Sequence, residues 1–551
     1  MVAAQVIADG KASELTMTRQ ANGGYEATYQ TPDTPALCWY YFSAFLPNGR
    51  TIYYGNAQDG LGGVGQTSDH VPPAFQITVY DPSYQAPAFM RDGVMYQIFP
   101  DRYARSKMPE SKRTDIYLHE NWDDRPKVRV ESIPGDNYSL DFFGGDLKGI
   151  RAHLADMADL GVTVIYMNPI FRARSNHRYD TADYSVIDPM LGTEEDFVQL
   201  CREAAKYGIR IMLDGVFSHT GDDSVYFNRY GRQPSIGACQ SKSSPFYTWY
   251  KFKHYPDDYA CWWGFKSLPE LDKENEDYRN YILSDHGIVR KWLRAGASGW
   301  RLDVADELPM RFLRDLRTAA RQEKHDAVIL GEVWEDASHK VSYGETRCYC
   351  LGDTLDSVMN YPLRNACISF LLERTDAEAL CRVIWAQQEN YAPPFYYSLM
   401  NLMGSHDRAR ILSILGGSVS RDDARGDENE PKLTEEQYAL GKQRMLKFLT
   451  ILVCLPGIPC IYYGDEVGLQ GAADPYCRGT YPWGHEDLEL REQVKEILAL
   501  RKRQVLRTGS MTVRSDGADA IIIRREIKGE QDVFGFDAKS DVFEMRIDRK
   551  I

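Results

Sequence analysis

Between Asp92 and about residue 484, short apolar runs alternate with amphipathic segments. The runs have the length of buried strands, and the segments between them carry apolar residues at helical spacing. This alternation is typical of an α/β protein with a parallel sheet. Eight runs qualify as strand candidates, and they are VMYQIFPDR, VTVIYMNPI, IRIMLDGVF, GWRLDVA, AVILGEVW, LDSVMNY, YSLMNLMGSHD and IPCIYYGDE.

Helix candidates follow most of these strands, for example DLKGIRAHLADMADLG, TEEDFVQLCREAAKYG and NEDYRNYILSDHGIVRKWLRAG. Eight parallel strands that alternate with helices predict a (β/α)8 TIM barrel. One connection, between His219 and Leu268, is too long for an ordinary loop and is rich in Tyr, Trp, Gly and Pro. It predicts a small domain, residues 220–268, inserted after the third strand.

The two ends of the chain differ from the barrel region in their pattern of apolar runs and turns. Residues 1–88 contain short alternating runs separated by turns, which predict an N-terminal β-sandwich-like, carbohydrate-binding-like domain. The barrel is expected over residues 89–484, and residues 485–551 supply its last helix and a C-terminal β domain. GLGGVG (Gly60–Gly65) fits a dinucleotide-binding pattern, but QTSDHVPP after it cannot open a helix, so a glycine-rich loop is expected.

Composition narrows the classes of partner and the cellular location. A net charge of −14 argues against nucleic acid or an anionic membrane as a partner. The 35 tyrosines and 10 tryptophans favour flat amphipathic ligands such as sugars. The opening MVAAQVIADGKASELTM shows no basic region followed by an apolar core, so no signal peptide is expected, and the 11 cysteines lack C-x-x-C spacing. A cytoplasmic location with reduced thiols is therefore expected, although a secreted chain already trimmed of its signal would look the same.

Four strand candidates end in acidic side chains. One such acid is usually a cap for the next helix, whereas four in one barrel indicate a shared site at the carboxyl ends of the strands. RIMLDGVFSH supplies Asp214 and His219, GWRLDV supplies Arg301 and Asp303, AVILGEVW supplies Glu332, and SLMNLMGSHD supplies His406 and Asp407.

The pair Arg301 and Asp303 is unusual for a core strand. Residues two apart share one face, so both lie opposite Trp300. The cation favours the ionised carboxylate and suits Asp303 to nucleophilic attack. Glu332 follows an apolar strand and is the better candidate for a raised pKa and for general acid/base work. Glycoside hydrolysis needs two carboxyl groups of this kind, one protonated to give a proton to the leaving oxygen and one ionised to attack or to activate water. A divalent cation could also bind these acids, but the interleaved Arg and His side chains make that alternative weaker.

The chain resembles the α-amylase superfamily of glycoside hydrolases, and within it the neopullulanase, cyclomaltodextrinase and maltogenic amylase group. The resemblance runs from about Val94 to Trp483. It rests on DGVFSH, GWRLDVADE, GEVW and GSHD, which correspond in order to the four hallmark segments of the family. LPELD, YQIFPDRY, FFGGDLKGI, NHRYDTADY and YYGDEVGLQGAADPYCR resemble further stretches typical of the group.

The resemblance implies roles for individual residues: Asp303 as nucleophile, Glu332 as acid/base and Asp407 as third carboxylate. It also implies a substrate-binding set, which is His177, Tyr179, Asp214, His219, Arg301, Trp334, His406, Asp474 and Arg478. The expected function is a retaining α-glucan hydrolase that cleaves α-1,4 bonds, with α-1,6 cleavage left open, through a covalent glycosyl-enzyme. The substrates would be maltooligosaccharides, cyclodextrins, pullulan or starch.

Two other functions stay open at this point. A transglycosylase would pass the same intermediate to a second sugar. A catalytically inactive carbohydrate-binding or scaffold relative is disfavoured because Asp303, Glu332 and Asp407 are all present. The resemblance allows a homodimer.

Several positions depart from the family pattern. Ser218 and Asp306 stand where relatives usually or often have Asn, and Asp306 and Glu307 are adjacent acids with no assigned role. The loop ARSKMPESKRTD lacks the Asn/Asp-rich run that holds calcium in some relatives, and only Gly144–Asp146 survives of that pattern. We therefore expect no metal ligands and no required cofactor, with calcium left open.

Overall fold

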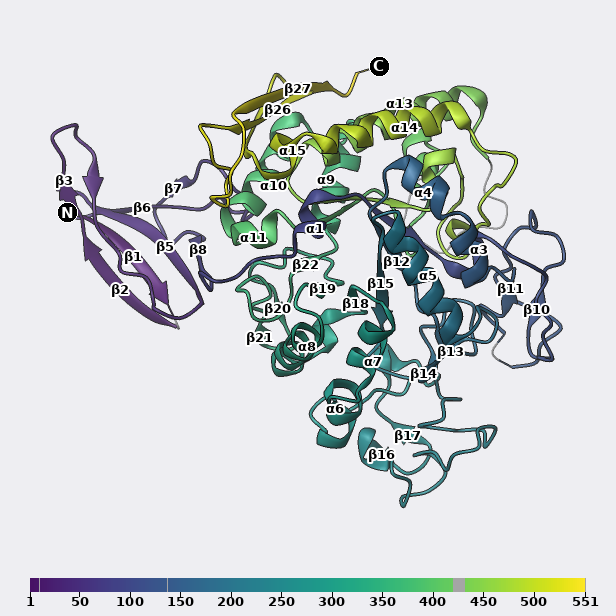
Figure 1. Cartoon of the computed structure of the whole chain (residues 1–551). Helices are drawn as coiled ribbons and strands as arrows, with labels where there is room; N and C mark the ends of the chain where they lie inside the picture. The colour runs from purple at the N-terminus through teal and green to yellow at the C-terminus, as the bar shows by residue number, and fades with distance from the viewer. Residues whose placement is uncertain (9, 136, 420–431, 551) are drawn as a thin grey trace.

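The computed structural model describes residues 1–8, 10–135, 137–419 and 432–550. Figure 1 shows an N-terminal sheet on one side, a central barrel, and a C-terminal sheet beside the barrel helices. Between β15 and β18 the chain leaves the barrel and forms a lobe that carries β16 and β17.

The central sheet confirms the predicted TIM barrel, and each of the eight strand candidates contains one of its strands. The strands are parallel, and a bridge between Met359 and Met400 joins the first and last members of the sheet order. In spatial order they are β22 (Ser357–Val358), β19 (Val328–Gly331), β18 (Gly299–Leu302), β15 (Arg210–Gly215), β12 (Val164–Met167), β9 (Met95–Ile98), β24 (Ile458–Tyr462) and β23 (Met400–Leu402).

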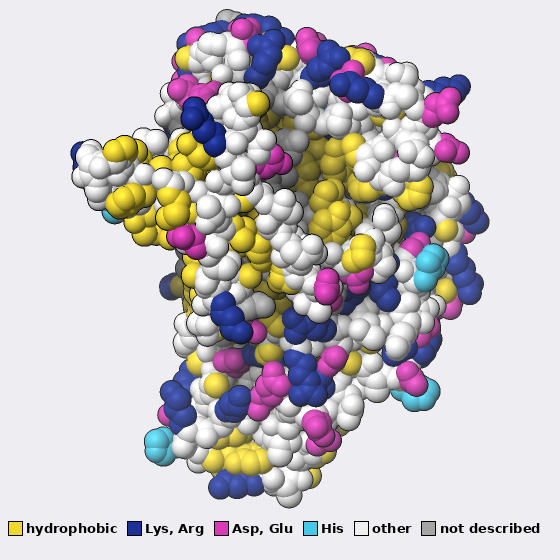
Figure 2. Space-filling model, turned by 90° about the vertical axis from the view of Figure 1, so that its left-hand side faces the viewer, with side chains coloured by type: hydrophobic (Ala, Val, Ile, Leu, Met, Phe, Trp, Pro, Cys, Tyr) yellow, Lys and Arg dark blue, Asp and Glu magenta, His cyan; other side chains and the backbone are white. Residues whose placement is uncertain are grey.

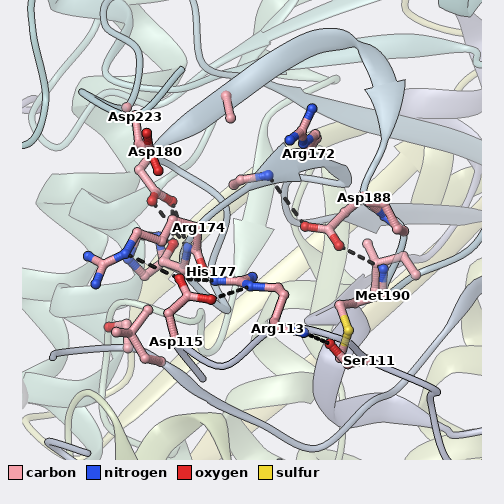
Figure 3. Close-up of a pocket in the computed structure, with 18 of the residues that line it drawn as sticks. Ser111, Arg113, Asp115, Arg172, Arg174, His177, Asp180, Asp188, Met190 and Asp223 are labelled. Atoms are coloured by element: carbon pink, nitrogen blue, oxygen red, sulfur yellow. Dashed lines mark hydrogen bonds and ion pairs between the residues drawn. The ribbon is translucent and has the colours of Figure 1, made fainter. Parts of the chain in front are cut away.

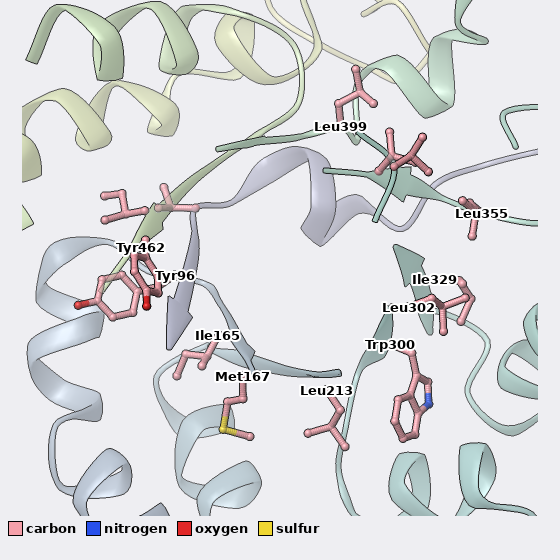
Figure 4. Close-up of a cluster of buried hydrophobic side chains, with 14 of the residues drawn as sticks. Tyr96, Ile165, Met167, Leu213, Trp300, Leu302, Ile329, Leu355, Leu399 and Tyr462 are labelled. Carbon is pink, nitrogen blue, oxygen red and sulfur yellow. The ribbon is translucent and has the colours of Figure 1, made fainter. Parts of the chain in front are cut away.

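Successive side chains along each barrel strand point alternately into two separate apolar clusters. Met95, Val164 and Met212 belong to a small cluster that fills the barrel interior. Trp300 and Leu302 belong to the larger cluster between the strands and the surrounding helices, part of which Figure 4 shows. Burying one such side chain contributes roughly 1.5–3 kcal/mol. Arg301 therefore lies on the inner face of β18, as the two-residue period predicts.

Helices surround the barrel, and several of them begin at a side-chain cap. Thr193 and Asp196 form a capping box at the start of α5, and Thr434 and Gln437 form one at α13. The helices of this region are α1 (Ala88–Asp92), α2 (Pro100–Tyr103), α3 (Leu147–Ala152), α4 (Leu154–Leu160), α5 (Glu194–Lys206), α6 (Glu276–Leu283), α7 (Ile288–Ala295), α8 (Met310–Glu323), α9 (Tyr361–Leu371), α10 (Ala377–Asn390), α11 (Pro393–Tyr396), α12 (Ile411–Gly416), α13 (Glu435–Cys454) and α14 (Leu488–Ala499).

Two of the three quoted helix candidates are each divided into two helices. DLKGIRAHLADMADLG breaks at His153 between α3 and α4, and the third breaks between Ser284 and Gly287. The inserted segment contains only short elements, and short strand pairs are found both there and in other loops that connect the barrel elements. These are β10 (Tyr117–Leu118) with β11 (Asp141–Phe142), β13 (Phe171–Ala173) with β14 (Thr181–Ile187), β16 (Phe252–His254) with β17 (Asp258–Tyr259), and β20 (Val341–Ser342) with β21 (Glu345–Thr346).

The N-terminal region is an antiparallel sheet, as predicted in outline, with an added two-stranded pair. Its strands are β1 (Val2–Ala8), β2 (Lys11–Thr16), β5 (Ala36–Phe45), β6 (Thr51–Gly55), β7 (Gln66–Ser68) and β8 (Phe75–Val79), and the pair is β3 (Thr18–Arg19) with β4 (Tyr25–Glu26). Figure 2 looks onto this side of the molecule, where hydrophobic side chains gather near the middle and charges of both signs surround them.

GLGGVG is a loop that packs the N-terminal region onto α10. A Cβ on Gly62 would come within 2.4 Å of the backbone nitrogen of Ala386, so the contact requires glycine there. The C-terminal region follows α15 (Gln504–Thr508) and is an antiparallel sheet of β25 (Ser510–Ser515), β26 (Ala520–Ile527) and β27 (Asp541–Asp548). Among the described helices, none is both long and apolar enough to cross a membrane.

Candidate active site

The guanidinium of Arg301 lies at the centre of the predicted acidic cluster. Its Nη1 is 2.9 Å from Asp214 Oδ1 and 3.0 Å from Asp303 Oδ1, and its Nη2 is 2.9 Å from Glu332 Oε2. Arg301 is fully buried, and the three acids come from the ends of adjacent strands β15, β18 and β19. One cation therefore holds three carboxylates at the carboxyl end of the barrel.

Glu332 is held by two further donors. The backbone N–H of Val304 donates to its Oε2 at 2.8 Å, and the indole N–H of Trp334 donates to its Oε1 at 3.1 Å. Val304 adopts φ +37°, a left-handed conformation that is unusual for a β-branched residue. Such strain persists only where surrounding contacts impose it, and here it accompanies a hydrogen bond to the candidate acid/base.

Asp214 accepts two phenolic hydroxyls on the side away from Arg301. Tyr166 donates to its Oδ2 at 2.6 Å and Tyr179 donates to the same oxygen at 2.8 Å. Asn168 in turn donates to the Tyr179 hydroxyl at 2.9 Å. Asp214 is thus a fully bonded anchor for Arg301 and Tyr179.

A second group of predicted residues is linked to the cluster through Tyr179 and Asp407. The ring of His406 is stacked on Tyr179 with centroids 5.2 Å apart, and His406 Nε2 is 3.3 Å from Asp407 Oδ1. Arg478 Nη2 lies 3.7 Å from the same Asp407 oxygen, while its Nη1 pairs with Asp474 at 2.9 Å. His177 accepts the backbone N–H of Tyr179 at 3.0 Å on its Nδ1.

His219 and Trp334 complete the predicted set. His219 Nδ1 is 2.8 Å from the hydroxyl of Ser218, while its buried Nε2 has no hydrogen-bond partner among the described residues. An unpaired buried nitrogen is what a substrate hydroxyl would satisfy. Trp334 stacks on Tyr361 at 3.9 Å. The predicted residues other than His219 therefore contact the cluster or a residue that contacts it.

Burial dominates the electrostatics of the site. It raises the pKa of Asp303 well above its ordinary value, and the charge of Glu332 raises it further, while Arg301 opposes both. The expectation that Arg301 by itself keeps Asp303 ionised is therefore incomplete, because the guanidinium is shared among three acids. Burial also lowers the pKa of His177 and of His219 to about 3, so both imidazoles are neutral at pH 7.

Asp407→Asn is expected to raise the free energy of unfolding more at pH 8 than at pH 5. Burial and the charge of Glu332 raise the pKa of Asp407 to about 7, whereas an unfolded Asp titrates near ~3.9. Because the folded pKa is the higher one, the ionised group costs stability as the pH rises through this window.

We expect an extra gain of about 1–3 kcal/mol at pH 8, given that 29% of the Asp407 side chain is exposed. Urea unfolding at the two pH values measures it, with the 83% exposed Asp285→Asn as control. An equal gain at both pH values would contradict the assignment.

A cavity of about 1210 Å³ whose lining includes many charged side chains opens beside the cluster, and Figure 3 shows some of the residues that line it. Asp303, Glu332 and Asp407 do not line it, and His177 is the member of the predicted set that does. Arg113 and Arg174 pair there with Asp115. Asp146, which also lines the cavity, accepts a hydrogen bond from the Ser106 hydroxyl and caps α3 by accepting the backbone N–H of Gly149. This residue of the Gly144–Asp146 stretch, which matches the calcium-binding pattern of some relatives, therefore has hydrogen-bond partners within the protein.

Sequence reasoning missed several residues that hold the cluster. Gln97 donates to Asn168 and lies 3.0 Å from His406 Nδ1, and Tyr166 and Tyr361 are equally buried in the site. Gln97 was detectable as a lone polar residue on the inner face of an apolar strand. Tyr166 and Asn168 are two apart and thus share that face on the next strand.

Comparisons with known proteins identify the family of this chain. Residues 97–511 match the model of the alpha amylase catalytic domain. The amylopullulanase of Thermoanaerobacterium thermosulfurigenes is 40% identical over 95% of this chain, which spans 30% of the length of that protein. Neopullulanase 2 of Thermoactinomyces vulgaris is 32% identical over 87% of this chain and 74% of its own length.

A solved structure is also similar over most of the chain. Cyclic α-maltosyl-(1→6)-maltose hydrolase from Arthrobacter globiformis, in complex with that saccharide, superimposes with a TM-score of 0.68 at 31% identity. The match covers 81% of this chain and 90% of the other. The hallmark segments, the barrel and the match over residues 97–511 together place this chain in the α-amylase family of glycoside hydrolases.

Proposed function

We propose that this chain hydrolyses α-glucosidic bonds of glucans with retention of anomeric configuration. The observation that carries the proposal is the position of Asp303 and Glu332, which contact the same guanidinium from the ends of neighbouring strands. Retaining glycosidases need two carboxyl groups about 5–5.5 Å apart, and two acids that share one guanidinium are close enough to act on one bond.

The chemistry follows from these two acids. The Asp303 carboxylate attacks the anomeric carbon while Glu332 gives its proton to the departing oxygen, which leaves a glycosyl-enzyme ester. Glu332, now ionised, takes a proton from water as the water oxygen attacks the same carbon and releases Asp303. Arg301 stabilises Asp303 as it leaves, and the hydrogen bonds from Val304 and Trp334 keep Glu332 in place.

The surrounding residues would orient the sugar that is attacked. His219 offers a buried nitrogen with no partner among the described residues, and His406 and Asp407 offer a neutral or charged polar pair 3.3 Å apart. Tyr179 presents a ring next to Asp214. These groups support binding of a pyranose through its hydroxyls and one apolar face.

The substrate is proposed to be an α-glucan that contains α-1,4 bonds, with α-1,6 bonds also accepted. Relatives named amylopullulanase and neopullulanase, and a solved hydrolase whose saccharide contains an α-1,6 bond, support this breadth. Chromatography of products from β-cyclodextrin, pullulan and soluble starch, with initial rates, tests it. Maltotriose from pullulan would report α-1,6 cleavage and panose α-1,4 cleavage, whereas turnover of none of the three would refute the proposal.

Transglycosylation is the second candidate, and Trp334 is the observation that favours it. Its ring stacks on Tyr361 and its N–H is bonded to Glu332, so it offers an ordered apolar surface next to the departing group. A sugar seated there would compete with water for the glycosyl-enzyme. Product analysis with excess maltose as acceptor separates transglycosylation from hydrolysis, because transfer lengthens the products and hydrolysis does not.

A further inference from the structure

Gln97 is a polar side chain enclosed in the barrel interior. It lies on β9, two residues after Met95 of the interior cluster, and none of its surface is exposed. Its amide nitrogen, Nε2, is 3.1 Å from Asn168 Oδ1 and 3.0 Å from His406 Nδ1. Its amide oxygen has no hydrogen-bond partner among the described residues. The side chain of Gln97 therefore acts through its two N–H groups.

The direction of the hydrogen bonds around Gln97 follows from Asp214. This carboxylate pairs with Arg301 and accepts the hydroxyl hydrogen of Tyr179 at 2.8 Å. The Tyr179 oxygen then accepts from Asn168, so Asn168 turns its NH2 group toward Tyr179 and its carbonyl oxygen toward Gln97. Two amide oxygens cannot bond to each other, so Gln97 must present its NH2 group to Asn168. The orientation of both amides is thus set by Asp214.

The second N–H of the same NH2 group determines which nitrogen of His406 is protonated. Because Gln97 donates, His406 Nδ1 accepts, and an imidazole nitrogen that accepts carries no hydrogen. His406 is 1% exposed, and burial lowers its pKa well below the ordinary value, so the ring is neutral and has one N–H. That hydrogen is on Nε2, which lies 3.3 Å from Asp407 Oδ1. The network therefore selects one tautomer, whose N–H faces Asp407.

A purely structural role does not account for glutamine at this position. A buried amide oxygen without a partner costs free energy. A methionine in its place would have a similar size and no such oxygen. The apolar cluster of the barrel interior already contains methionines on four strands or the residues beside them, which are Met95, Met212, Met359 and Met400. What glutamine adds is a pair of N–H donors, and both are directed at residues of the candidate active site.

We propose that Gln97 is a positioning residue that holds His406 as the Nε2–H tautomer, with that N–H directed at Asp407 and at a sugar hydroxyl bound beside it. In the other tautomer, a bare Nε2 would face the oxygens of Asp407, and the sugar would lose one donor. Hydrogen bonds to sugar hydroxyls in glycosidases strengthen in the transition state, so this loss should lower kcat more than it raises KM. The inference rests on the proposed function and adds to it the residue that fixes the protonation of His406.

Nitrogen-15 NMR of protein labelled in its histidines reports the tautomer, because protonated and unprotonated ring nitrogens have distinct chemical shifts. His406→Asn identifies the signals of this ring among those of the 11 histidines. In the parent we expect an unprotonated Nδ1 and a protonated Nε2. In Gln97→Met we expect the Nδ1 signal to shift, because the bond from Gln97 is lost. A parent ring protonated on Nδ1, or an Nδ1 signal that Gln97→Met leaves unchanged, would overturn the proposal.

Kinetics on maltoheptaose show whether this tautomer matters to the reaction. Loss of a direct donor to the transition state costs about 10²-fold or more in kcat. In Gln97→Met the donor remains but is no longer held, so we expect kcat to fall about thirtyfold and KM to change less than about threefold. The melting temperature should not fall, because the variant also removes the unpaired amide oxygen.

Asn401→Ala is the matched control, because Asn401 is a buried polar residue of barrel strand β23 that bonds to Asn360 and to the carbonyl of Pro456. We expect this variant to have a lower melting temperature and a kcat close to that of the parent. An unchanged kcat in Gln97→Met, or an equal fall in Asn401→Ala, would overturn the positioning role. If the parent does not cleave maltoheptaose, the proposed function fails, whereas the NMR result tests the tautomer of His406 independently of activity.

Discussion

Glu332→Gln is expected to lower kcat on starch or maltoheptaose by at least about 10³-fold. The amide keeps the size of the side chain and can still accept one of the two N–H groups of Val304 and Trp334, but it has no acidic proton to give to the departing oxygen. Loss of a general acid and of its later action as base together account for an effect of this order. Initial-rate measurements with reducing-sugar detection are sufficient.

The pattern across substrates separates this role from a structural one. α-Maltosyl fluoride carries a leaving group that needs no proton, so the first step should proceed in the variant and the second should be slow, which gives a burst of fluoride release. Glu335→Gln is the matched control, because Glu335 is three residues away, 64% exposed, and paired with Lys340. Near-normal turnover of starch by Glu332→Gln would refute the acid/base assignment.

Asp303→Asn is expected to lower activity by at least about 10⁴-fold on both the glucan and the fluoride. A nucleophile is required whatever the leaving group is, and the amide cannot form the glycosyl ester. Asp303 is 7% exposed, and burial raises its pKa, so the neutral amide should not lower the melting temperature.

Scanning calorimetry provides the folding control for this variant. A folded Asp303→Asn protein that retains a fluoride burst comparable to that of Glu332→Gln would contradict the nucleophile assignment. A burst in the Glu332 variant and none in the Asp303 variant is the pattern that two distinct roles predict.

Much of the barrel and of its acidic centre could be predicted from residue patterns alone. Each strand has a short apolar run, and the two-residue period placed Arg301 and Asp303 on the inner face. Acids at the ends of several strands, taken with the closure of a barrel, imply that those acids meet. Such features are local, so sequence records them directly.

Other features depend on contacts between distant segments. The left-handed conformation of Val304 cannot be read from a β-branched residue, because it exists only where tertiary contacts impose it. The raised pKa of Asp303 could likewise not be predicted from the sequence, because its burial and the sharing of Arg301 among three acids depend on the fold. The hydrogen bonds that Glu307 accepts from Trp263 and Tyr343 could not be predicted from the sequence either, because the two donors come from separate loops.

The most direct test of a double-displacement reaction at Asp303 and Glu332 is the configuration of the first product. Proton NMR during the first minutes of maltoheptaose hydrolysis resolves the α and β anomeric signals before mutarotation mixes them. Attack by Asp303 followed by attack of water inverts the anomeric carbon twice, so the new reducing end should appear as the α anomer. Initial appearance of the β anomer would mean a single displacement by water and would contradict the covalent role of Asp303.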